Sequence, residues 1–134
     1  MPYEVTFTKR VDTPDRTHYI NDCCVGGDVV LQALLPTLRQ RYGEIQAEQE
    51  DWGWFVWFST GGKKLAVDVF CDNPETGEFR MHLTCRVPRM LFSDKIDDTP
   101  ELEDLRSLIL HALTNWLQHP PTITPLDTKY RLTA

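Results

Sequence analysis

The chain lacks a long apolar run and an excess of positive charge, and we expect no signal peptide. None of its hydrophobic stretches approaches the roughly 20 residues that a membrane helix needs. The opening residues, Met1 to Val5, have neither the basic region nor the apolar region of a signal peptide. Its 14 Lys and Arg against 20 Asp and Glu give a net charge of −6, which disfavours nucleic acid and anionic membranes as partners. We therefore expect an acidic cytoplasmic protein that binds neither nucleic acid nor membrane.

The sequence also lacks the spacings that hold metals or phosphates. Structural zinc sites need paired ligands such as C-x2-C, whereas Cys23 and Cys24 are adjacent. Gly26-Gly27 precedes a predicted helix, but no G-x-G-x-x-G or Walker pattern follows it. The other cysteines are Cys71 and Cys85, and without an export signal we expect all four thiols to be reduced. The sequence thus predicts neither a metal nor a cofactor.

Two segments have the apolar spacing of amphipathic helices. The first runs from Asp28, a candidate cap, to Tyr42, and Gly43 can end it. Pro36 inside this helix should face solvent and bend it. The second begins with a cap residue and a proline at Thr99-Pro100-Glu101. The predicted buried stripes are Leu31, Leu34, Leu35, Leu38 and Tyr42 in the first helix, and Leu102, Leu105, Ile109, Leu113 and Trp116 in the second.

Five other segments show the alternation of β-strands. They are residues 3–11, 44–50, 53–59, 65–72 and 78–87. Gly61-Gly62 is typical of a two-residue hairpin and Asn73 to Gly77 of a longer loop, so the last four strands form an antiparallel meander. Residues 88–98 are predicted as a loop and 122–134 as an extended tail. The chain is therefore predicted to be a single α+β domain spanning 1–134, in the order β-α-β-β-β-β-α, with both helices on one face of the sheet.

The two turns fix which residues face each other across the meander. A turn at Gly61-Gly62 pairs Thr60 with Lys63, and the following loop pairs Asp72 with Glu78. Both registers put one apolar set on the face that the helices cover: Trp54, Val56, Phe58, Leu65, Val67, Val69, Cys71, Phe79, Met81, Leu83 and Cys85. The opposite face, which we call the outer face, carries Phe55, Trp57, Ala66, Asp68, Phe70, Arg80, His82, Thr84 and Arg86.

The outer face carries the strongest functional signal in the sequence. Aromatic residues together with arginine are typical of the core of a protein interface rather than of a solvated sheet face. We therefore predict a non-catalytic binding protein, with a protein partner or a second copy of the chain on this face. The interface or ligand candidates are Phe55, Trp57, Asp68, Phe70, Arg80, His82, Thr84 and Arg86.

Three alternatives remain open for this face. Asp68 beside His82 is an acid–imidazole pair, so the face could instead form a small-molecule site or an enzyme in which Arg80 holds an anionic ligand. The aromatic residues could also serve cross-strand pairing alone, or lie beneath the predicted tail, residues 122–134. In size, charge and layout the chain is similar to small acidic bacterial proteins that act as immunity proteins or secretion chaperones, a likeness that carries no function by itself.

Overall fold

The computed structural model describes residues 2–89, 92–96 and 99–127, with the backbone alone for residues 89 and 92–96. The elements in chain order are β1 (Tyr3–Thr8), η1 (Asp22–Cys24), α1 (Gly27–Tyr42), β2 (Glu48–Glu50), β3 (Gly53–Thr60), β4 (Lys63–Asn73), β5 (Glu78–Arg89), β6 (Phe92–Ile96), α2 (Pro100–Leu117) and β7 (Thr122–Pro125).

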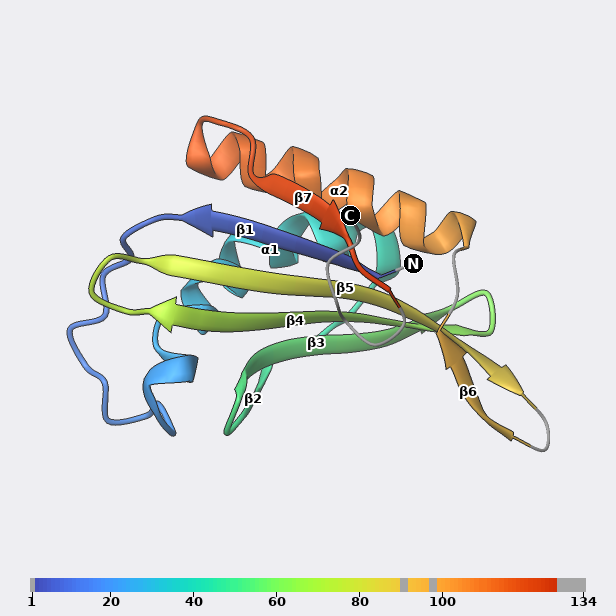
Figure 1. Cartoon of the computed structure of the whole chain (residues 1–134), viewed down its shortest axis with the longest axis horizontal. Coiled ribbons are helices and arrows are strands. Elements are labelled where there is room, and N and C mark those ends of the chain that lie inside the picture. Colours follow the sequence, from blue (N-terminus) through green and yellow to red (C-terminus); the bar gives the residue numbers. More distant parts are fainter. Residues whose placement is uncertain (1, 90–91, 97–98, 128–134) are drawn as a thin grey trace.

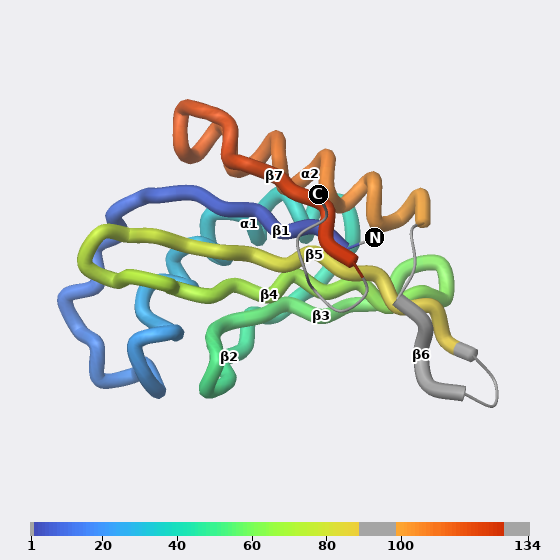
Figure 2. Tube along the Cα trace, in the orientation of Figure 1, coloured from blue at the N-terminus to red at the C-terminus, as the bar shows by residue number. Residues whose placement is uncertain are grey.

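The described strands form one antiparallel sheet in the order β2-β3-β4-β5-β1-β7, with β6 paired to β5 beyond the end of β1 (Figure 1). The predicted α+β class and the meander from β2 to β5 are confirmed, and Figure 2 traces that meander along the chain. Two segments predicted to lack strands contain them. Residues 88–98 contain the end of β5 and all of β6, and the predicted tail begins with β7. Both missed strands have five residues or fewer, too few for alternation to give a clear signal.

The predicted register holds along most of the meander. Phe55 pairs with Asp68, and Asp68 pairs with His82. The hairpin turn forms as predicted because Gly61 and Gly62 have φ values of 57° and 76°, and a two-residue turn of this type needs positive φ at both positions. The outer face therefore carries the residues that the sequence places there.

One predicted pair of the second turn was wrong. Glu78 pairs with Asn73 rather than with Asp72, and the register shifts between Cys71 and Asn73. The turn is tighter than predicted because the Gly77 N–H donates to the Asn73 carbonyl at 2.9 Å. Asp72 is consequently the extra residue of a β-bulge.

The cap of helix α1 lies two residues earlier than predicted. Its cap is Gly26, at φ 83° and without a side-chain hydrogen bond, so the prediction that Asp28 caps the helix was wrong. The Asp28 carboxylate instead accepts a hydrogen bond from Tyr19 Oη at 2.6 Å and lies 3.5 Å from His18 Nε2. Gly43 ends the helix with φ 89°, positive as predicted.

Two other helix predictions are confirmed, the solvent-facing position of Pro36 and the cap at Thr99, whereas Tyr42 is half-buried rather than buried. Pro36 lies inside α1 and is exposed. Thr99 caps α2, since its side chain accepts a hydrogen bond from the Leu102 N–H at 3.1 Å. Trp116 is only half-buried, and Ala112 and Leu117 complete the buried stripe in its place.

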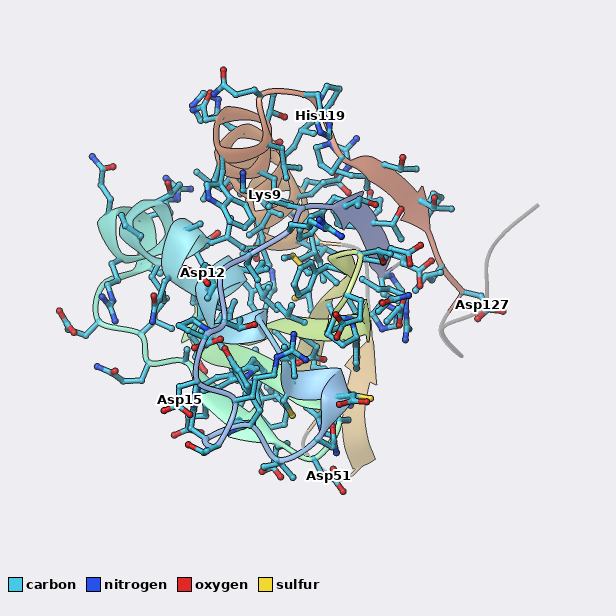
Figure 3. The ribbon with its side chains drawn as sticks, turned by 90° about the vertical axis from the view of Figure 1, so that its left-hand side faces the viewer. Lys9, Asp12, Asp15, Asp51, His119 and Asp127 are labelled. Carbon is cyan, nitrogen blue, oxygen red and sulfur yellow. The ribbon has the colours of Figure 1, made fainter. Side chains whose placement is uncertain are left out.

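Both helices cover the inner face of the sheet. Seen from one end (Figure 3), α1 and α2 lie on the same side of the strands, and Asp51 and Asp127 mark opposite borders of the sheet. Inner-face residues such as Val67 and Leu83 are fully buried against the helices. No helix within the described ranges is long and apolar enough to cross a membrane.

Candidate functional site

A row of polar side chains crosses three strands of the outer face. Glu4 on β1 pairs with His82 on β5, which in turn pairs with Asp68 on β4. His82 Nε2 lies 3.2 Å from Glu4 Oε1, and the imidazole meets the Phe70 ring edge-on with the centroids 5.1 Å apart. Because His82 is buried, this row is a cross-strand network within the sheet rather than an open site.

Asp68 connects this row to Trp57. The indole Nε1 donates a hydrogen bond to Asp68 Oδ1 at 2.8 Å. Burial raises the pKa of Asp68, and the hydrogen bond from Trp57 and the charges of His82 and Arg86 oppose the rise. An ionised carboxylate is the stronger acceptor, so the protonation of Asp68 controls how firmly the indole is held.

Arg80 is already engaged by its neighbours. Its guanidinium makes two hydrogen bonds of 3.2 Å to the Asp72 carboxylate and lies 3.9 Å from Glu4. It also stacks over Phe70, at 4.7 Å from the ring centroid. A guanidinium with a bidentate partner has fewer donors left for an external anion. This arrangement weighs against Arg80 as the anchor of a ligand.

Four aromatic rings form a continuous strip on the outer face. Trp52, in the turn between β2 and β3, contacts Phe55 and Phe70 with ring centroids 5.7 and 5.3 Å apart. Phe55 contacts Trp57 at 4.2 Å. Phe55 is buried, whereas 59% of Trp57 is exposed. The strip therefore runs from a buried base to an exposed indole, which its neighbours hold in place.

A hollow of about 450 Å³ lies beside Trp57, where β3, β4 and β5 run together. Lys64 and Arg86 form a cross-strand pair at its border, and both are exposed. The described residues that line it are Trp57, Phe58, Ser59, Lys64, Leu65, Ala66, Asp68, Thr84 and Arg86. The hollow thus combines an aromatic wall, small side chains on its floor and two cations.

A second polar cluster lies at the start of α1, away from this face. Burial and the hydrogen bond to Asp28 raise the pKa of Tyr19 to about 12. His18 approaches the same carboxylate, so the cluster ties the loop before η1 to the helix. No group of three or more His, Cys, Asp and Glu side chains in the described residues is placed to hold a metal ion.

All eight predicted site residues lie on the outer face, but they differ in exposure. Trp57 and Arg86 are exposed, Asp68, Phe70 and Arg80 are half-buried, and Phe55, His82 and Thr84 are buried. The structure brings Trp57, Asp68, Thr84 and Arg86 together around the hollow, whereas the described lining does not include Phe55, Phe70, Arg80 or His82.

Sequence reasoning missed Glu4 and Trp52 as parts of this face. Alternation in β1 puts Glu4 on the face opposite Val5, but no local signal shows that β1 pairs with β5. Trp52 lies in a turn, where alternation does not apply.

No protein-family model, curated protein or solved structure was found to match this chain.

Proposed function

We propose that the chain is a non-catalytic binding protein that recruits a protein partner to the outer face around Trp57. The observation that supports this proposal most directly is that Trp57 is 59% exposed and lines a hollow of about 450 Å³. A large aromatic side chain held by a hydrogen bond and by ring contacts loses little freedom on binding, which suits it to anchor a partner.

The surroundings of His82 support binding rather than catalysis. The imidazole is buried beside Glu4, and the neighbouring hydroxyl of Thr84 is buried as well. A general base needs a substrate within hydrogen-bond reach, and this pair offers little surface to one. We also propose a cytoplasmic location, and the free thiols of Cys23, Cys24, Cys71 and Cys85 are consistent with a reducing compartment.

Site-specific photocrosslinking in the cell that makes the protein tests this function. Benzoylphenylalanine replaces Trp57 in one variant and Ser107, an exposed residue of α2, in the control. We expect a discrete crosslinked partner from position 57 that position 107 does not give. Adding Arg86→Glu should remove this product, because it reverses a charge at the border of the hollow. Equal crosslinking from both positions, or none from position 57, contradicts the proposal.

An anionic small molecule is the second candidate, and the volume of the hollow favours it because it lies in the range of ligand pockets. Of the predicted trio of Asp68, Arg80 and His82, only Asp68 is in the described lining of the hollow, and Lys64 and Arg86 rather than Arg80 are the cations there. Calorimetry with indole-3-acetate as the probe tests this candidate. Arg86→Gln should weaken binding of the probe more than Arg80→Gln does. The reverse order would mean that Arg80, as predicted from the sequence, binds the anion.

A further inference from the structure

The chain leaves β7 on the outer side of the sheet. The Leu126 N–H donates to the Pro2 carbonyl at 2.7 Å, which extends the pairing of β7 with β1 by one residue. Alternation then gives Leu126 the same face as Thr124, opposite Ile123, which packs against the core. Figure 3 shows the labelled Asp127 on the side of the sheet away from α1. The residues beyond 127 therefore start from the outer face.

A cross-strand row leads from this point to the hollow. When the register of β1 is continued by one residue, the row is Leu126, Pro2, Thr84, Ala66 and Trp57. Its first three members are buried, whereas Trp57 at its other end is exposed. Leu126 is 1% exposed although it is outside the hydrophobic cluster beneath the helices, so it is buried on the outer side. Thr84, Ala66 and Trp57 line the hollow.

Residues 128–134, with the sequence TKYRLTA, lie outside the described ranges, and their length suits this path. Four strand spacings, about 19 Å in all, separate Leu126 from Trp57 along the row. An extended chain advances about 3.3–3.6 Å per residue, so position 130 can reach β4 and position 132 can reach β3. The segment is therefore long enough to bring both side chains to the hollow.

The segment also has side chains that suit the hollow. In an extended conformation Tyr130 and Leu132 share one face, and Lys129 and Arg131 share the other. The first pair matches the aromatic wall and the small side chains of the floor. The two cations oppose the net charge of −6 of the whole chain, which attracts the segment to the rest of the protein. Because the segment is tethered, its effective concentration at the hollow is of millimolar order.

We propose that residues 128–134 fold back across the outer face and place Tyr130 and Leu132 in the hollow, so that a partner has to displace them. The inference rests on the proposed function, because it concerns the regulation of that same site. If the segment fills the hollow in about nine-tenths of the molecules, the apparent affinity for a partner falls about tenfold, since only the open fraction binds.

Nuclear Overhauser spectroscopy of the isotopically labelled full chain tests the contact. We expect cross-peaks from the Tyr130 ring to the methyl group of Ala66, and from the Leu132 methyl groups to the Trp57 indole. A sample that mixes two differently labelled preparations separates contacts within one molecule from contacts between two. The cross-peaks should arise within one molecule.

A matched pair of double variants isolates the two faces of the segment. Tyr130→Ser with Leu132→Ser should shift the resonance of the Trp57 Nε1–H, because the hollow loses its occupants. Lys129→Ser with Arg131→Ser should shift it less, since these side chains point away from the hollow and only their charge is lost. Unchanged resonances of the buried residues of α2 show that both variants keep the fold.

Crosslinking from position 57 connects the contact to binding. In the variant with serine at positions 130 and 132 we expect a severalfold higher yield of the partner product than in the chain with the natural segment. An equal or lower yield overturns the regulation even where the cross-peaks are present.

Other results overturn the contact itself. They are the absence of cross-peaks between the segment and the hollow, equal shifts in the two double variants, and cross-peaks that arise only between molecules, which would make a second copy the occupant. A partner product from position 57 without cross-peaks leaves the proposed function standing and removes this inference alone. Cross-peaks without a partner product from either chain refute the proposed function and the regulation, and leave only the intramolecular contact.

Discussion

The hydrogen bond between Trp57 and Asp68 predicts that one substitution has a pH-dependent cost. Trp57→Phe keeps an aromatic ring but removes the Nε1 donor, which is 2.8 Å from the carboxylate. A hydrogen bond to a charged group contributes roughly 1.5–3 kcal/mol. Since 59% of Trp57 is exposed, solvent competes for the donor, and we expect a cost of about 1–2 kcal/mol at neutral pH.

The sign of the pH dependence follows from the pKa of Asp68. Burial raises this pKa, so the folded chain binds the proton more tightly than the unfolded chain. Protonation of Asp68 alone therefore stabilises the fold as the pH falls through the raised pKa towards the ordinary value for aspartate. The Trp57 hydrogen bond lowers this pKa, so its removal raises the pKa further. The cost of Trp57→Phe should consequently shrink as the pH falls and the carboxyl becomes neutral.

Urea unfolding followed by circular dichroism at about pH 7.5 and about pH 4 measures this effect. The matched control is Trp52→Phe. Trp52 makes ring contacts with Phe55 and Phe70, and the packing energy of such contacts does not depend on pH. Its cost should be the same at both pH values. If Trp57→Phe costs as much at the lower pH as at the higher one, the indole acts by packing and the hydrogen-bond reasoning is refuted.

Three further predictions concern the stability of the fold and the exposure of its cysteines. Leu126→Ala should cost about 2–5 kcal/mol in unfolding free energy, because the Leu126 side chain is buried, with 1% of the residue exposed; a loss below about 1 kcal/mol would contradict this burial. Thr99→Ala should cost about 1 kcal/mol through loss of the α2 cap, whereas Thr99→Ser should retain most of it in the same assay. Thiol titration with an aromatic disulfide should modify Cys23 rapidly, because it is the exposed cysteine of the four. The other three should react only after unfolding, and burial also raises the pKa of Cys71 to about 11; rapid reaction of a second thiol in the folded chain would contradict the burial seen here.

The local part of the fold is predictable from the sequence. Gly61-Gly62 and the alternation on either side of it determine the pairing of β3 with β4, because the two-residue turn sets the register and a slip of one residue would turn the apolar side chains outward. The pairing of β1 with β5 and β7 is not predictable in this way. These partners lie far apart in the chain, and alternation shows which residues share a face but not which strands are neighbours.

Only part of the candidate site, likewise, is predictable from the sequence. Alternation places Phe55 and Trp57 on one face, yet one is buried and the other is 59% exposed. The difference arises from Trp52, which contacts the Phe55 ring from a turn that has no period. The engagement of Arg80 by Asp72 and Glu4 also depends on contacts between strands. Sequence reasoning therefore identifies the face, whereas exposure and ion pairing need the three-dimensional arrangement.

The position of β1 between β5 and β7 has a consequence for the order of folding. Val5 pairs with Met81 on β5 and with Ile123 on β7, so β1 pairs with strands that lie far from it along the chain. Closing such long loops is slow compared with forming the hairpins between β3 and β5. We expect refolding in milliseconds to seconds, as in other domains rich in non-local strand pairs. Until β1 docks, the edge of β5 stays unpaired, and until β7 is complete the other edge of β1 stays open to pairing with other chains.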